Sequence, residues 1–218
     1  SLVGSEMCIR DSSVVYVTSS STRYTSYYAI TDDGRCWSWG QNDYGQLGRG
    51  NVTDETTTPV EMTAQSGSGL LNKKVLHVMS SEGNSNVVRT WFLTTEGKVY
   101  FCGQNETYGA YSGLISASSS VNITLPAELT DAATTINSDG QKVVAMYTGG
   151  GRYSTNYYIT DGGNSGETAS KVYANGLNTN GEMGTGSNTS HGSASGNWRL
   201  KEIEFDSGPE IMTIAHNS

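Results

Sequence analysis

Short runs of apolar residues recur along the chain, and each is followed by a stretch in which apolar and polar positions alternate. The first runs occupy residues 14–17, 75–78 and 143–146, and a second apolar stretch then ends at Ile30, Leu93 or Ile159. Short runs of this kind, bounded by turn residues, are typical of β-strands. The pattern therefore predicts a pair of strands that is repeated three times.

A turn signal follows the second strand, with Asp33-Gly34 in the first copy and Glu96-Gly97 in the second. Glycine adopts a positive φ without a Cβ clash, so these pairs predict tight hairpins. A third strand then begins with a basic residue and has an aromatic residue two positions later: Arg35 and Trp37, Lys98 and Tyr100, Lys171 and Tyr173. A period of two places these residues on one face and Cys36, Val99 and Val172 on the other.

The fourth strand of each copy is predicted around residues 60–62, 127–129 and 201–203, where an acidic residue precedes an apolar one. Gly40, Gly103 and Gly176 mark the copies and are 63 and 73 residues apart. Most of this difference lies in one loop, because ten residues separate Thr160 from Lys171 where the other copies have three. Strands that keep their register around a variable loop indicate a surface connection.

Four short antiparallel strands per unit of about 60 residues cannot bury both faces alone, which favours stacked blades. The stretch GQNDYGQLGRG, residues 40–50, and the hairpin ITDDGRCWSW before it resemble the repeat of the regulator of chromosome condensation family. This resemblance implies an all-β partial β-propeller, with about three four-stranded antiparallel blades of a seven-bladed ring. The structural signature residues that it implies are Gly34, Trp39, Gly40, Gly45, Leu47, Gly48, Gly97, Gly103, Gly109, Gly176, Gly181 and Gly184.

The chain departs from the family pattern in two ways. The second copy has Gly109-Ala110-Tyr111-Ser112 in place of Gly45-Gln46-Leu47-Gly48, and the His that family members often carry before the second strand is missing from all three copies. These departures indicate a divergent member of the family.

Several segments are expected along the chain. Residues 2–11 resemble a translated sequencing adaptor, so residues 1–12 are expected to be non-native. Blades are predicted at 13–74, 75–142 and 143–210, and residues 211–218 are expected to start a fourth repeat that breaks off. A fragment of this kind is expected to self-associate through its open strand edges.

The formal net charge of −8 disfavours nucleic acid and anionic membrane surfaces as partners. No apolar run approaches the roughly 20 residues that a membrane-spanning helix needs, so membrane insertion is not expected. The composition is rich in Asn, Ser, Thr and Gly and favours a secreted, cell-surface or virion setting over a nuclear one.

Candidate catalytic chemistry is sparse. No nucleophile elbow, phosphate-binding loop or paired Cys motif occurs, so neither a cofactor nor enzymatic activity is expected. His77 is interpreted as a half-buried histidine and Cys36 and Cys102 as core residues. Asp161, Asn164 and Glu167 offer oxygen ligands for calcium in the inserted loop, and the alternative is a plain flexible loop.

The leading hypothesis is a protein-binding scaffold that recognises partners through loops on one face. The candidate loops are residues 51–58, 113–124, 161–170 and 187–197, and the candidate contact residues are Asp161, Asn164, Glu167, Tyr111, Asn188 and Trp198. The alternatives are a regulator of the nucleotide-exchange or chromatin type from the same family, purely structural spacer repeats, and an active site at the central channel.

Overall fold

The computed structural model describes residues 12–20, 25–53, 56–81, 88–105, 121–129, 140–149, 155–162, 170–190 and 200–205. These residues form three four-stranded antiparallel sheets, which we call blades 1, 2 and 3. Blade 1 comprises β1 (Val14–Ser19), β2 (Ser26–Thr31), β3 (Cys36–Gly40) and β4 (Thr56–Glu61). Blade 2 comprises β5 (Val75–Ser80), β6 (Arg89–Thr94), β7 (Val99–Asn105) and β8 (Val121–Glu128). Blade 3 comprises β9 (Val143–Thr148), β10 (Thr155–Thr160), β11 (Val172–Gly176) and β12 (Lys201–Ile203).

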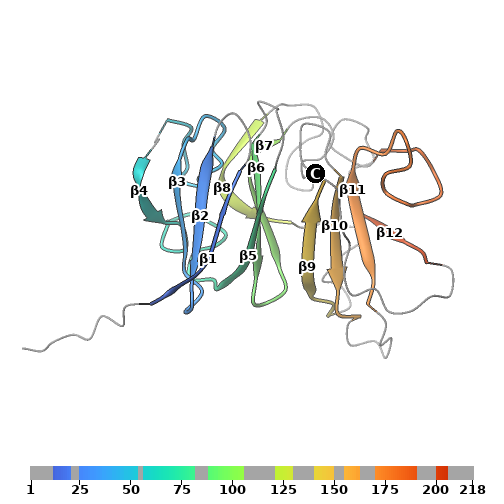
Figure 1. Ribbon diagram of the computed structural model, residues 1–218, viewed down its shortest axis with the longest axis horizontal. Helices are drawn as coiled ribbons and strands as arrows, with labels where there is room; N and C mark the ends of the chain where they lie inside the picture. Colours follow the sequence, from blue (N-terminus) through green and yellow to red (C-terminus); the bar gives the residue numbers. More distant parts are fainter. Residues whose placement is uncertain are drawn as a thin grey trace, which may run out of the picture.

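The blades stand side by side, with blade 2 between the other two (Figure 1). The first strands form the inner side of the assembly, because β1 contacts β5 and β5 contacts β9. Successive turns alternate between the two ends of each sheet. We call the end with the β2–β3 turns and their equivalents the hairpin end, and the end with the β3–β4 connections the loop end. The all-β prediction of three four-stranded antiparallel blades is confirmed.

Each inner strand contains one extra residue opposite its partner strand. The pairing slips between Val14 and Tyr16 in blade 1, between Val75 and His77 in blade 2, and at the same place in blade 3. The extra residues are Val15, Leu76 and Val144, which are 62%, 56% and 51% exposed. A β-bulge turns a side chain away from the regular alternation, so these three apolar residues face solvent.

The third strands begin one residue later than predicted. Arg35, Lys98 and Lys171 precede β3, β7 and β11, and their carbonyl oxygens accept the last backbone hydrogen bond of the hairpin, from Thr31, Thr94 and Thr160 (2.9–3.0 Å). The predicted separation of faces holds in blade 1. The Arg35 guanidinium lies 5.7 Å from the ring centroid of Trp37, and Cys36 is fully buried on the other face.

The recurring basic and acidic positions of the sequence meet across the third and fourth strands. The ion pairs are Arg35–Glu61 (3.9 Å), Lys98–Glu128 (2.9 Å) and Lys171–Glu202 (3.6 Å). The paired side chains are between about a quarter and two fifths exposed. Each pair therefore contributes at most about 1 kcal/mol and fixes strand register more than it adds stability.

Two hydrophobic cores lie between the blades. Tyr28, Ile30, Cys36, Met62 and Leu70 of blade 1 pack on Val75, Val78, Phe92, Tyr100 and Cys102 of blade 2. Met79, Trp91, Leu93, Val99, Phe101, Ile123 and Leu129 of blade 2 pack with Val143, Met146, Tyr158 and Tyr173 of blade 3, together with Leu200. We call the face of a blade that looks toward the next blade its forward face, and the opposite face its backward face.

Candidate functional site

The loop end of blade 1 is organised by one buried asparagine. Asn42 Oδ1 accepts a hydrogen bond from the Leu47 N–H (3.0 Å), and its Nδ2 donates to the carbonyl oxygen of Asn51 (3.0 Å). One side chain thus fixes both ends of the turn that we call the blade 1 glycine loop, residues 42–50. A buried amide that bonds to the backbone in this way holds a loop in one conformation without regular secondary structure.

Blade 3 contains the same device. Asn178 Oδ1 accepts from the Met183 N–H (2.7 Å), and Nδ2 donates to the carbonyl oxygens of Ser187 (2.7 Å) and Thr189 (3.1 Å). Asn42 and Asn178 are both fully buried. Residues 178–186, the blade 3 glycine loop, are therefore built by the same local bonding as residues 42–50.

In each of these two loops, a carbonyl oxygen accepts a hydrogen bond from a tyrosine of the second strand. The Tyr28 hydroxyl donates to the carbonyl oxygen of Gln46 (3.0 Å), and the Tyr157 hydroxyl donates to the carbonyl oxygen of Glu182 (2.5 Å). The side chains of Gln46 and Glu182 also have equivalent bonds, since each accepts the N–H two residues before it, that of Tyr44 (2.9 Å) and Asn180 (2.8 Å). Backbone N–H bonds from Glu182 itself and Asn180 lower the pKa of the Glu182 carboxyl.

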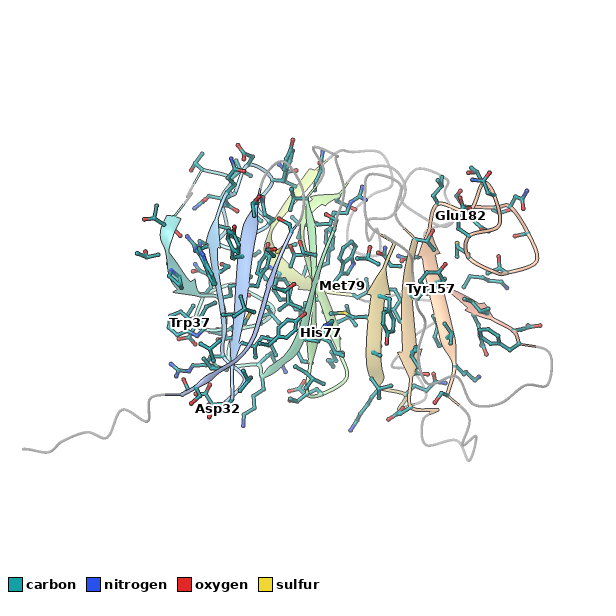
Figure 2. All side chains as sticks on the ribbon, in the orientation of Figure 1. Asp32, Trp37, His77, Met79, Tyr157 and Glu182 are labelled. Carbon is teal, nitrogen blue, oxygen red and sulfur yellow. The ribbon has the colours of Figure 1, made fainter. Side chains whose placement is uncertain are left out.

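The side chains that these loops expose differ between the blades. Asp43 is exposed and Tyr44 is half-buried in blade 1, whereas Thr179 and Asn180 are exposed at the equivalent positions of blade 3, together with Glu182. Figure 2 shows Glu182 near the loop end and Asp32 at the hairpin end. The arrangement therefore combines a constant internal frame with a variable exposed surface.

The organising asparagines were missed by sequence reasoning, although their signal was present. Asn42, Asn105 and Asn178 each lie two residues after a marker glycine, and all three are at most 2% exposed. The signature residues implied by the family resemblance were mainly glycines and Leu47, whereas the side-chain bonds that hold the loops come from the recurring asparagine. Asn105 is also the first residue of an Asn-x-Thr glycosylation pattern, and its side chain is buried in the structure.

The described signature glycines all have positive φ. The values are +89° for Gly34, +101° for Gly40, +77° for Gly45, +68° for Gly48, +77° for Gly97, +107° for Gly103, +128° for Gly176, +83° for Gly181 and +66° for Gly184. Leu47 is fully buried at the centre of its loop, and Trp39 stacks on Tyr27 with 5.6 Å between ring centroids. Gly109, Tyr111, Asn164, Glu167 and Trp198 lie outside the described residues.

Gly45 and its neighbours also form the joint with blade 2. The Gly50 N–H donates to the carbonyl oxygen of Thr124 in β8 (2.8 Å). A Cβ on Gly45 would lie 2.9 Å from the Thr124 Cα, and one on Gly48 would lie 2.9 Å from the ring of Pro126. The blade 1 glycine loop therefore needs glycine both for its turn and for its close approach to the next blade.

The candidate contact residues Asp161 and Asn188 do not share a surface. Asp161 follows β10 at the hairpin end, where its carboxylate accepts the Lys142 N–H (2.8 Å). Asn188 is exposed between β11 and β12, at the loop end. The expectation that these loops lie on one face is wrong for this pair, because consecutive turns of an antiparallel sheet alternate between its two ends.

A hollow of about 260 Å³ lies between the three inner strands, and His77 and Met79 are labelled there in Figure 2. Its lining includes Tyr16, His77 and Tyr147, and the Tyr16 hydroxyl lies 3.2 Å from His77 Nε2. Burial lowers the pKa of His77, so its imidazole is neutral at pH 7. None of the described residues that line the hollow has a carboxylate that could act with this histidine as an acid–base pair.

The described cysteines are core residues, as interpreted from the sequence. Cys36 and Cys102 are free thiols in the core between blades 1 and 2, and the Cys102 thiol donates to the Gln46 carbonyl oxygen (3.1 Å). Burial raises the pKa of both thiols, which keeps them protonated.

Within the described ranges, no group of three His, Cys, Asp or Glu residues is placed to hold a metal ion. The same part of the chain contains no helix that could cross a bilayer.

Known proteins of similar fold were found by sequence and by structure. Residues 33–86 match the repeat model of the regulator of chromosome condensation (RCC1). Human WBSCR16 superposes with a TM-score of 0.61 and 20% identity over 89% of this chain and 38% of its own. Yeast RCC1 (Prp20), in its complex with Kap60, gives 0.57 and 18% over 88% of this chain and 37% of its own.

A further structure is that of Prp20p from Saccharomyces cerevisiae, which was described with its binding properties to Gsp1p and histones. It gives a TM-score of 0.56 and 17% identity, over 88% of this chain and 38% of Prp20p. The present chain thus spans less than two fifths of each of these proteins. Residues 33–86 thus match one RCC1 repeat, and the three blades have a fold similar to that of RCC1-type β-propellers.

Proposed function

We propose that the chain is a protein-binding scaffold that recognises its partner through the loop end of the blades. One observation carries this proposal: the two glycine loops share their internal bonds and differ in their exposed side chains. A rigid frame with variable surface residues suits recognition, because little entropy is lost when preformed loops bind. In the first two blades the hairpin end is closed by four-residue turns.

The relatives support a protein partner as the ligand class. Prp20 has been crystallised with Kap60, and Prp20p was described with its binding to Gsp1p and histones. The net charge of −8 favours a basic partner surface over DNA, because long-range attraction between opposite charges speeds encounter. A secreted, cell-surface or virion setting and a non-enzymatic role belong to this proposal.

The proposal is tested with a peptide library displayed on phage and selected on the immobilised 218-residue chain. Asp43→Ala and Thr179→Ala change equivalent exposed positions of the two glycine loops. We expect selected peptides to bind at least one of these variants about tenfold more weakly, a loss of about 1.4 kcal/mol. Asp32→Ala is the matched control, because it removes a carboxylate from the hairpin end.

The outcomes separate the alternatives. Peptides that bind Asp32→Ala more weakly, but bind the two loop variants as well as the wild type, would place recognition at the hairpin end and contradict the proposal. A selection that enriches no peptide favours the spacer role. Binding of Gsp1p or core histones to the chain, weakened by Asp43→Ala, would favour the exchange or chromatin role of the same repeat family.

A further inference from the structure

Blade 3 contains two asparagine–glycine pairs in different settings. Asn175-Gly176 lies in β11, where Asn175 pairs with Asn156 of β10 and is 2% exposed. Asn180-Gly181 lies in the turn of the blade 3 glycine loop, where Asn180 is exposed. The same pair of residues is thus held in a buried strand at one position and presented to solvent at the other.

An asparagine that precedes a glycine is prone to one spontaneous reaction. The backbone nitrogen of the glycine attacks the side-chain amide carbon of the asparagine, and the glycine has no side chain to block the approach. Asparagine is accordingly among the thermolabile residues of proteins. The reaction needs a backbone that can rotate and a glycine N–H without a strong hydrogen bond. Exposed turns meet these conditions more readily than buried strands do.

The backbone nitrogen of Gly181 is weakly bonded and accessible. Its N–H donates to the Asn178 carbonyl oxygen at 3.3 Å, whereas the equivalent bond in blade 1, from Gly45 to Asn42, is 3.0 Å long. Gly181 has a φ of +83°, and an added Cβ would meet no described atom closer than Asn188 Oδ1, at 3.9 Å. The turn therefore leaves room for the attacking nitrogen to move.

Two nearby asparagines are held against this reaction. Asn175 Oδ1 accepts a hydrogen bond from Asn156 Nδ2 (3.2 Å), and both side chains are buried. Asn178 is fully buried, both ends of its amide are bonded to the loop, and Thr179 follows it in place of glycine. Blade 3 therefore contains two internal controls for the reactivity of Asn180.

The Glu182 carboxylate lies beside the exposed asparagine, near the loop end (Figure 2). Its Oε1 accepts a hydrogen bond from Asn180 Nδ2 (2.9 Å), and its Oε2 accepts one from the Asn180 N–H (2.8 Å). These bonds restrain the amide, and the negative charge disfavours the negative charge that develops on the Gly181 nitrogen during attack. Glu182 is therefore expected to slow the reaction at Asn180.

We propose that Asn180 is a site of spontaneous deamidation in the folded chain. The Gly181 nitrogen bonds to Asn180 Cγ and loses its proton to water, and the amide nitrogen takes up a proton and leaves as ammonia. Water then opens the resulting cyclic imide at either of its carbonyl carbons, which gives aspartate or isoaspartate. Water is the only co-reactant, and nothing is oxidised or reduced.

Deamidation changes the surface of the blade 3 glycine loop and not that of the blade 1 glycine loop, which has Tyr44 at the equivalent position. The new carboxylate stands beside Glu182, so repulsion between like charges replaces the bond from Nδ2. Isoaspartate also lengthens the backbone within the segment that Asn178 spans through its bond to the Met183 N–H (2.7 Å). Deamidation is separate from the proposed partner recognition, because it needs only water.

The test follows the 218-residue chain by mass spectrometry during incubation in mildly alkaline buffer. Trypsin releases residues 172–199 as one peptide, which contains all three asparagines. We expect Asn180 to convert at least about tenfold faster than Asn175 in the folded chain, and Asn178 to stay intact. In denaturant the two Asn-Gly pairs lose their different settings, so they are expected to convert at similar rates.

Two variants assign the mass change and the effect of the neighbouring carboxylate. Asn180→Gln keeps an amide on a longer side chain, which disfavours ring closure, and is expected to abolish conversion at this position and leave Asn175 unchanged. Glu182→Gln removes the charge and is expected to speed conversion of Asn180 severalfold. A rate at or below that of the wild type for Glu182→Gln would contradict the slowing effect of Glu182.

Two outcomes would overturn the proposal. One is an Asn180 that stays intact in the folded chain over a period in which the denatured chain converts. The other is an Asn175 that converts as fast as Asn180 while the chain is folded. Both are independent of the peptide selection, because no partner is present during the incubation.

Discussion

The blade 1 and blade 3 glycine loops have the same internal structure in different surroundings. In each loop a buried asparagine accepts the N–H five residues on, and a strand tyrosine donates to the loop backbone. The blade 1 loop lies against β8, with the Gly50 N–H bonded to the Thr124 carbonyl oxygen, whereas the blade 3 loop has no such neighbour among the described residues. The conformation of the glycine loop therefore depends on bonds within its own blade. Its glycines are needed for a second reason where another blade packs against the loop, as at Gly45 and Gly48.

The largest expected difference between the two loops comes from Gly45→Ala and Gly181→Ala. Both substitutions place alanine at a positive φ, which costs about 1–2 kcal/mol. Gly45→Ala also forces a methyl group against Thr124, and this overpacking is expected to cost roughly 1–3 kcal/mol more of stability. Urea unfolding should therefore show the larger loss for Gly45→Ala. Equal losses at the two sites would mean that the close approach of blade 2 adds no constraint.

Removal of the organising asparagines should affect the two blades equally. Asn42→Ala and Asn178→Ala each leave the N–H of a buried residue without its partner and remove a bond to a loop carbonyl oxygen, at about 2–3 kcal/mol per site. The matching bonds lead us to expect values within about 1 kcal/mol of each other in urea unfolding. Asp43→Ala, at the neighbouring exposed position, serves as the control and should change stability by less than about 0.5 kcal/mol. A cost confined to one asparagine would break the equivalence of the loops.

The tyrosine hydroxyls should contribute unequally because their burial differs. Tyr28 is fully buried, and its hydroxyl also lies 2.9 Å from Thr90 Oγ1 of blade 2, so Tyr28→Phe removes two buried hydrogen bonds. We expect a loss of about 1–2 kcal/mol for Tyr28→Phe and about 0.5 kcal/mol for Tyr157→Phe, whose bond is accessible to water. Thermal unfolding of both variants measures this difference. The reverse order would show that the hydroxyl bond to blade 2 is unimportant.

The smallest expected effect is a response to acid in blade 3. Glu182 has a lowered pKa because backbone N–H groups stabilise its carboxylate, whereas the equivalent Gln46 does not titrate. Ionised Glu182 therefore adds stability above the pKa of the unfolded chain, and this contribution is lost as the pH falls through the lower folded pKa. Hydrogen exchange at Asn180 should speed up on acidification relative to Tyr44, after correction for intrinsic rates. Glu182→Gln should abolish that relative change, and its persistence would assign the response to another group.

Much of the fold was predictable because it depends on local pattern. The apolar runs placed β1, β5 and β9, and the Asp-Gly and Glu-Gly pairs placed the hairpins of blades 1 and 2. The recurring basic and acidic positions were visible in the sequence, but their meeting across the third and fourth strands requires the register of the sheet. The bulges at Val15, Leu76 and Val144 were missed, since an apolar residue in an apolar run gives no sign that it faces solvent.

The candidate site was less predictable because it depends on contacts between distant segments. Asn42 and Asn178 recur at a fixed distance from a glycine, yet their role becomes clear only when Leu47 and Met183 fold back onto them. Asp161 and Asn188 lie at opposite ends of blade 3, because consecutive turns of an antiparallel sheet alternate between its two ends. The approach of Gly45 to Thr124 joins segments about 80 residues apart in sequence, and no local pattern contains it.

The most direct measurement of this account is amide hydrogen exchange by NMR, at a concentration that keeps the chain monomeric. We expect comparable protection at Leu47 and Met183, whose N–H groups bond to the buried asparagines. We also expect strong protection at Gly50, which bonds to Thr124 of blade 2, and fast exchange at Gly186. Exchange at Gly186 as slow as at Gly50, or an unprotected Met183, would contradict this expectation. The two glycine loops would then not share one bonding pattern that β8 covers in blade 1 and no described residue covers at Gly186 in blade 3.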